Sequence, residues 1–205
     1  MPEHNEWVNN NFPKKPENKQ EKIEKQKFFL NIDIARYNWA MDHLSKADVV
    51  LSDTDFTSPL AHNYAERWIE GAFDIYAELV EEYGYYLKAG KLGLPDKYIY
   101  LDASLDERLC RRKEDFENTE RKRNDLFFTP PFPQNMRHFY YQMMNEASER
   151  KSLPAVWYDN CKSKEEALVD LWKIICEEEK STDCKNMTDE LIKSLRLSVE
   201  DKQVF

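Results

Sequence analysis

The chain has 205 residues, of which 41% are hydrophobic and 34% are charged, and its formal net charge is -9. This size and apolar content fit one domain with its own core. The negative charge argues against a general nucleic-acid-binding protein, which needs a net basic surface. No apolar run approaches the roughly 18–20 residues that span a bilayer, and the N-terminus lacks the basic and apolar regions of a signal peptide. We therefore expect a cytoplasmic protein whose partners include neither a membrane nor a polymeric nucleic acid.

The numbers and spacing of glycine, cysteine and histidine residues argue against two kinds of binding site, a glycine-rich phosphate loop and a zinc site. Only four glycines occur, which nearly excludes a glycine-rich loop that cradles phosphate. The four cysteines are widely spaced, and the four histidines show no ligand spacing to the cysteines or to each other. We expect reduced thiols that serve packing, and no zinc site.

The first part of the chain predicts a polar loop followed by a long helix. Residues 1–16 are polar and carry three prolines. Residues 17–46 predict one long helix or two in series, because apolar residues recur at helical spacing between Phe28 and Leu44. Arg36 lies on or near this apolar face. It is either a side chain that snorkels at the edge of the core or a functional group.

The next segment, residues 47–63, predicts a strand, a polar loop and a helix. The apolar run at 49–51 predicts a short buried strand, and a loop with two aspartates and three hydroxyl residues follows it. Ser58 is expected as the N-cap of the helix, with Pro59 at its first position. Ligands of open α/β sheets bind at the carboxyl ends of strands, so this loop is a candidate site. The alternative is a polar turn that only caps the helix.

The remaining segments predict helices that alternate with two more strands. Strands separated by helices of this length are parallel, with helical crossovers. The expected elements are a helix or helix pair at 59–89 with weak points at Gly71 and Gly84, a loop with Gly90 as its C′ residue, a strand at 97–103, a helix opened by the Ser104–Glu107 capping box, a helix at 134–151, a strand at 153–159, and a helix opened by the Ser163–Glu166 capping box.

Several of these segments resemble thymidylate kinase-like and deoxynucleoside kinase-like P-loop proteins. A strand followed by Asp53, with Ser58-Pro-Leu-Ala61 downstream, is similar to the family's strand, its Asp-Arg or Glu-Arg pair and its Ser and Leu-Ala residues. The resemblance continues in order over residues 2–178. It includes Pro2-Glu3 before Trp7, the helix with Phe28-Phe-Leu and Arg36, the strand Tyr98-Ile-Tyr-Leu-Asp102 with Ser104-Leu-Asp-Glu-Arg108, the arginine-rich stretch 108–123 that resembles a lid, and the strand Val156-Trp-Tyr-Asp159.

The resemblance implies an α/β fold, namely an incomplete P-loop NTPase-like three-layer fold with a short parallel sheet flanked by long helices. The domain would cover residues 1–180, and residues 181–205 would form a semi-detached tail with one short helix. The family's first strand and its Gly-x-x-x-x-Gly-Lys-Ser/Thr loop have no counterpart and would precede Met1. Thr54 stands where the family has arginine. Without the central first strand, sheet edges are left unpaired, so we expect a chain less stable than its length suggests.

The resemblance also implies roles for individual residues. Glu3 would accept the proton of the acceptor hydroxyl, Asp53 would hold Mg²⁺ through water, and Arg111 would neutralise charge on the transferring group. The acceptor would contact Arg36, Asp55, Ser58 and Trp7, and the phosphates would contact the lid residues Arg108, Arg112 and Arg121. The structural alternatives are a loose terminus, a turn aspartate and a solvated charged helix face.

These roles describe a phosphotransferase of the nucleoside or nucleotide kinase type, with ATP and Mg²⁺ as cofactors and a nucleoside-like small molecule as acceptor. A homodimer is compatible with them. Because the phosphate loop is missing, neither cofactor is expected to bind this chain tightly, and we expect it to be inactive alone. Two alternatives stay open: a non-catalytic remnant that binds a ligand or partner, and a mainly helical interaction protein. The kinase interpretation predicts that Asp53, Asp102 and Asp159 end adjacent parallel strands. If they do not, the mainly helical interaction protein is favoured and the family assignment is wrong.

Overall fold

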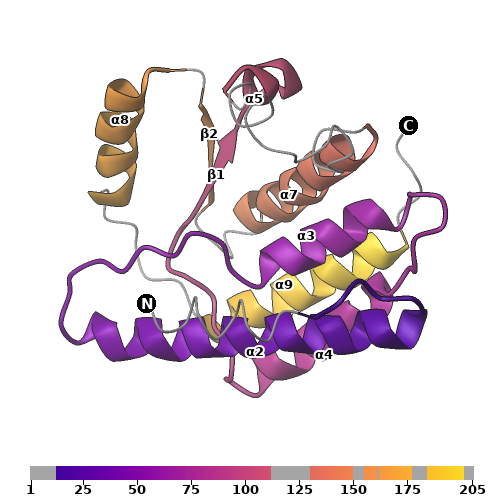
Figure 1. Cartoon of the computed structure of the whole chain (residues 1–205). Helices are drawn as coiled ribbons and strands as arrows, with labels where there is room; N and C mark the ends of the chain where they lie inside the picture. Colours follow the sequence, from indigo (N-terminus) through magenta and orange to yellow (C-terminus); the bar gives the residue numbers. More distant parts are fainter. Residues whose placement is uncertain (1–12, 112–129, 150–154, 161, 177–183, 201–205) are drawn as a thin grey trace.

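A computed structural model describes residues 13–111, 130–149, 155–160, 162–176 and 184–200. These residues form seven helices and two strands, so the predicted mixed α/β class is confirmed (Figure 1). The elements are α2 (Lys19–Leu44), α3 (Thr57–Glu66), α4 (Tyr76–Lys88), β1 (Tyr98–Asp102), α5 (Leu105–Arg111), α7 (Phe132–Glu149), β2 (Ala155–Asp159), α8 (Lys164–Cys176) and α9 (Cys184–Val199). No helix in this described part is long and apolar enough to cross a bilayer.

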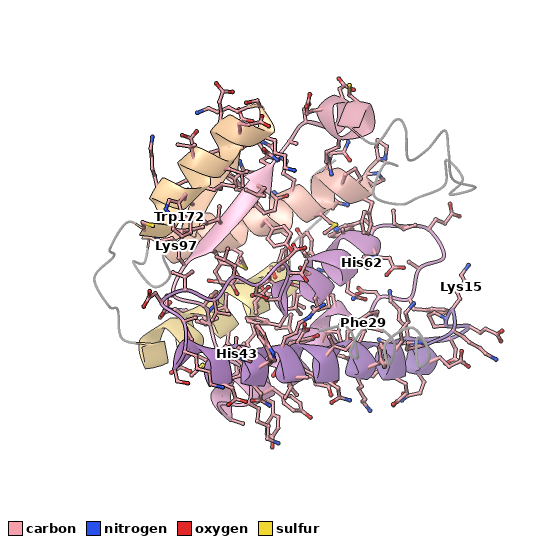
Figure 2. The ribbon with its side chains drawn as sticks, turned by 60° about the vertical axis from the view of Figure 1, so that its left-hand side comes forward. Lys15, Phe29, His43, His62, Lys97 and Trp172 are labelled. Atoms are coloured by element: carbon pink, nitrogen blue, oxygen red, sulfur yellow. The ribbon has the colours of Figure 1, made fainter. Side chains whose placement is uncertain are left out.

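The two strands pair in parallel, as the helical crossover between them predicted. Their register runs from Tyr98 opposite Ala155 to Asp102 opposite Asp159. Both strands are rich in aromatic and β-branched residues, which suit a half-buried pleated surface. One face of this sheet packs on α7, where Tyr140 contacts Tyr100 at 4.7 Å between ring centroids. At the start of β1, Lys97 donates to the carbonyl oxygen of Ile174 in α8 at 2.7 Å (Figure 2).

The predicted strand at 49–52 is wrong, because this segment has no strand structure. Val49 and Leu51 are 43% and 68% exposed, so the apolar run is not buried. A strand needs a neighbour to take up its backbone hydrogen bonds, and among the described residues only β1 and β2 pair with each other. The predicted N-cap at Ser58 is also misplaced. The helix begins at Thr57, whose backbone N–H donates to Asp55 at 2.9 Å.

The break in the 59–89 segment and both capping boxes follow the prediction. The segment divides into α3 and α4, and Gly71 between them has a φ of 76° that favours glycine. Ser104 caps α5 by accepting the Glu107 N–H at 3.1 Å. At the start of α8, Ser163 and Glu166 bond reciprocally, the Ser163 hydroxyl donating to the Glu166 carboxylate at 2.8 Å.

The core lies among α3, α4, α7 and α9 rather than on the sheet. Its fully buried side chains include Tyr64, Tyr76, Tyr83 and Phe139, each no more than 2% exposed. Tyr64 contacts both Tyr76 and Phe139 at about the distance expected of packed aromatic rings, 5.4 and 5.5 Å between centroids. The long helix α2 lies along this core (Figure 1).

The expectation of a semi-detached tail from residue 181 is wrong, because α9 is a core helix. Leu191, Ile192 and Leu195 are buried against the cluster, at most 6% exposed. The end of α9 is fixed by Arg67, which donates to the carbonyl oxygens of Ser198 at 3.3 Å and Val199 at 3.0 Å. Leu191, Ile192 and Leu195 recur at helical spacing, and this apolar stripe is the sequence signal for the burial.

Gly93 lies in the loop after α4, close to Tyr37 of α2, and its replacement tests how tightly this loop and helix pack. A Cβ atom there would lie 2.5 Å from Cε2 of Tyr37, so the ring would have to move. We expect Gly93→Ala to destabilise the fold by about 1–3 kcal/mol, as overpacking does, measured by urea unfolding. Gly84→Ala is the control. Gly84 lies within α4, and a Cβ atom there would lie 3.6 Å from Ile192 of α9, an ordinary van der Waals distance. This variant should be neutral or stabilising by up to about 1 kcal/mol; equal losses in both variants would contradict this account.

Candidate functional site

A group of polar side chains gathers where α2, the loop before α3 and the start of β1 meet. We call Asp33, Arg36, Thr54, Asp55 and Tyr98 the Asp33–Asp55 cluster. The sequence builds it from the buried positions of α2, which are Lys22, Gln26, Leu30, Ile32 and Asp33. Three of these five positions are polar, so this helix turns hydrogen-bonding groups as well as apolar side chains toward its neighbours.

Asp33 is the most deeply buried acid of the cluster, with a side chain 5% exposed. Its Oδ2 accepts a hydrogen bond from the Tyr83 hydroxyl of α4 at 3.1 Å. Its Oδ1 lies 3.6 Å from Nη1 of Arg36, one turn along α2. Burial raises the pKa of Asp33 from 3.8 to about 7, although the Tyr83 hydrogen bond and the Arg36 charge oppose the rise and Asp55 adds to it. This carboxyl group therefore changes its charge near neutral pH.

Both carboxylate oxygens of Asp55 accept hydrogen bonds from nearby protein groups. Its Oδ1 accepts the Thr57 backbone N–H at 2.9 Å and the Thr57 hydroxyl at 2.5 Å. Its Oδ2 accepts the hydroxyl of Tyr98 at the start of β1. Burial raises the pKa of Asp55, against the effect of these hydrogen bonds. Burial and the neighbouring Asp55 both raise the pKa of Tyr98, which stays a protonated donor.

Arg36 of α2 contacts the loop before α3 at Thr54, a residue with an unusual backbone conformation. Its Nη1 donates to the Thr54 hydroxyl at 3.3 Å, and its side chain is 44% exposed. Thr54 has a φ of 72°, in the left-handed region that β-branched residues rarely adopt. The Ser52 hydroxyl also donates to the Thr54 carbonyl oxygen at 2.8 Å. Strained residues of this kind persist only where surrounding contacts hold them, and Arg36 supplies one of those contacts.

A second polar group lies at the carboxyl ends of the two strands. Arg137 of α7 donates to both carboxylate oxygens of Asp102, with its shortest bond at 2.7 Å. Trp157 of β2 also donates to Asp102, at 3.2 Å. Burial and the Asp102 charge raise the pKa of the neighbouring Tyr100 to about 12. Tyr140 packs against Tyr100 with its ring tilted by 36° and donates to Ser58 at 3.4 Å, so it links the strand ends to the start of α3 beside the Asp33–Asp55 cluster.

The structure brings together three of the four acceptor residues that the sequence predicted. Arg36, Asp55 and Ser58 lie in or beside the Asp33–Asp55 cluster. Trp7 and Glu3 fall outside the described residues, as do the lid residues Arg112 and Arg121. Arg111 is the last residue of α5, and its side chain is likewise not described. Arg108 lies in the same helix, and its buried Nε has no hydrogen-bond partner in the described part of the chain.

The predicted metal role of Asp53 does not fit the site. Asp53 is exposed in the loop rather than placed at a strand end, so only Asp102 and Asp159 meet the expectation of aspartates at adjacent strand ends. The missing third strand end counts against the kinase family and favours a mainly helical interaction protein. Asp55, the other aspartate of this loop, has both oxygens engaged by Thr57 and Tyr98. Across the described ranges, no group of three His, Cys, Asp or Glu residues could hold a metal ion.

Sequence reasoning missed Asp33, Tyr98 and Arg137. Asp33 had a usable signal, since it lies one helical turn before Arg36 on the face that carries Leu30. Tyr98 alternates with Tyr100 and Asp102 on one face of β1, which is the period of a strand. Arg137 carried no such signal, because its partner Asp102 is 35 residues away.

Comparisons with protein-family models, with curated proteins and with solved structures found no match to this chain. The function is therefore argued from the geometry of the site.

Proposed function

We propose that this chain binds a nucleoside-like small molecule on a nucleoside or nucleotide kinase-like α/β scaffold, without transferring phosphate by itself. The acceptor site is the exposed side of the Asp33–Asp55 cluster. The scaffold assignment is supported by the parallel strands that end in Asp102 and Asp159, and by the capped helix after each of them. The P-loop NTPase-like architecture is part of the proposal.

The observation that carries the proposal is the placement of Arg36. It is a half-exposed guanidinium held at a buried carboxyl group and a strained loop residue. A guanidinium offers several donors in a fixed plane and favours hydroxyl-bearing or anionic ligands. The Thr54 hydroxyl lies next to it, and the Ser58 hydroxyl lies beside the cluster, where it accepts from Tyr140. A ligand with several hydroxyl groups, such as a ribose or deoxyribose, matches this set.

Binding without catalysis is the part of the proposal that rests on Asp55 and on the phosphate loop. A general base must reach the proton it removes. Glu3, the base that the resemblance implies, lies outside the described residues, and Asp55, an acid of the proposed acceptor site, has its oxygens occupied by Thr57 and Tyr98. The printed sequence contains no Gly-x-x-x-x-Gly-Lys-Ser/Thr loop, and such loops bind phosphate through successive backbone N–H groups. The second candidate function, ATP-dependent phosphoryl transfer, is favoured only by the strand-end aspartates and the arginines of α5.

Calorimetric titration tests the proposal. The natural ribonucleosides and deoxyribonucleosides are titrated one at a time into the full chain, followed by Mg-ATP. We expect binding of at least one nucleoside and no tight binding of Mg-ATP. Arg36→Gln should weaken the nucleoside affinity by about tenfold or more, because a hydrogen bond from a charged group contributes about 1.5–3 kcal/mol.

Arg196→Gln provides the matched control. Arg196 is also exposed and paired with a carboxylate, Glu81 at 2.7 Å, but it lies on α9. Its loss should leave the nucleoside affinity unchanged. Absence of binding by every nucleoside would overturn the proposal. Micromolar affinity for Mg-ATP would instead favour the phosphotransferase.

A further inference from the structure

The Asp33–Asp55 cluster holds two buried carboxyl groups beside a single guanidinium. Asp33 and Asp55 each lie within electrostatic range of Arg36 and of each other. Two carboxylates that share one cation in a low-dielectric site do not both ionise easily, because the second negative charge is left without a partner. The remaining groups that face Asp33 are Tyr83 from α4 and the Asp55–Tyr98 pair. None of these brings a second positive charge.

One nitrogen of Arg36 lies between two competing acceptors. Nη1 is 3.3 Å from the Thr54 hydroxyl and 3.6 Å from Asp33 Oδ1. A guanidinium usually pairs with an ionised carboxylate at about 2.7–2.9 Å, so this longer distance to Asp33 fits a neutral carboxyl group. The Thr54 hydroxyl then retains the hydrogen bond. The burial-raised pKa of Asp33, about 7, agrees with the same assignment.

We propose that loss of the proton from Asp33 draws Arg36 away from Thr54 and releases the loop backbone at residues 52–54, so that the cluster is a proton-controlled latch. When Asp33 is ionised, its carboxylate competes for Nη1 and the hydroxyl of Thr54 loses its donor. Thr54 then has one contact fewer to hold its left-handed backbone, and the loop moves toward an unstrained conformation.

The latch would also control the affinity of the site for the proposed ligand. An ionised Asp33 neutralises the guanidinium that is proposed to contact the acceptor, so affinity should fall as the pH rises through neutrality. This consequence rests on the proposed function, whereas the loop response does not. The test therefore reads the loop directly, in the protein without ligand.

The experiment is a series of proton–nitrogen NMR spectra of the full chain between about pH 5 and pH 9, a range that brackets the ordinary and raised carboxyl pKa values. In the unaltered protein the Thr54 amide signal should move with a midpoint near the pKa of Asp33, about 7. The Thr57 N–H donates to Asp55, so its signal follows that acid and is not the readout. In Asp33→Asn, which mimics the protonated acid, the Thr54 signal should stay at the low-pH position throughout. In Arg36→Gln the movement of the Thr54 signal should be lost, because the coupling residue is gone.

Asp170→Asn is the control. Asp170 lies on α8, outside the cluster, and pairs with Lys162 just before that helix, so this variant should leave the Thr54 titration intact. A Thr54 midpoint that persists in both Asp33→Asn and Arg36→Gln would overturn the latch, as would a Thr54 signal that never moves in the unaltered protein. If Asp33→Asn does not fold, the Arg36→Gln titration decides the question. A moving loop together with no nucleoside binding would keep the latch and reject the proposed function.

Discussion

Replacement of Leu195 by alanine is expected to destabilise the protein by about 2–5 kcal/mol, the usual cost of emptying a well-packed leucine site. Leu195 is 2% exposed on the inner face of α9, among the buried residues of α4 and α7. Its loss removes apolar contacts and leaves a cavity at the centre of the core. The free energy of unfolding in urea is the measurement.

Leu197 on the same helix provides the matched control. It is 49% exposed, so Leu197→Ala should change the free energy of unfolding by no more than about 0.5 kcal/mol. The two variants remove the same atoms from the same helix and differ only in burial. Similar effects from both would mean that α9 does not pack as described, and the tail expected from the sequence would regain support.

The contribution of Asp33 to the stability of the unaltered protein is expected to fall as the pH rises from about 4 to about 7, because its carboxyl group titrates differently in the folded and unfolded chains. Its pKa is raised from 3.8 to about 7 in the fold. Between these values the folded chain binds the proton and the unfolded chain does not, so each rise in pH favours unfolding. The loss from this group is on the order of 4 kcal/mol across the window and is complete above about pH 7.

Asp33→Asn isolates this contribution. The amide cannot ionise, yet its oxygen can still accept the hydrogen bond from Tyr83. The variant should lose the Asp33 part of the pH dependence and be more stable than the unaltered protein at about pH 8, where the buried carboxylate is charged. Denaturant unfolding at several pH values measures this difference. Parallel pH profiles for the two proteins would contradict the assignment of a raised pKa to Asp33.

The parts of the fold that sequence predicted are those fixed by neighbours along the chain. The Ser104 and Ser163 caps, the glycine-containing break before α4 and the aromatic strands all depend on residues a few positions apart. The parallel pairing of β1 and β2 followed from one further rule, that a helical crossover joins parallel strands.

The parts that sequence did not predict depend on distant partners. Val49-Val50-Leu51 has the composition of a strand, but no described strand pairs with it. Whether α9 is a tail or a core helix is decided by contacts with α4 and Arg67, more than 100 residues away. In the site, Arg36 and Asp55 were predicted from resemblance, whereas Asp33 and Tyr98 were not. The place of Asp33 depends on the packing of α2 against α4, and that of Tyr98 on the contact between β1 and the loop before α3.

The position of α9 late in the sequence has a consequence for how the chain folds during synthesis. Helices α3, α4 and α7 are made first, but the side of α4 and α7 that α9 covers stays uncovered until residues 184–199 have been added. Partly folded chains that expose apolar surface are prone to associate. Nascent chains of this protein should therefore depend on chaperones until α9 has been synthesised. Incomplete chains from translation that stalls before residue 184 should aggregate.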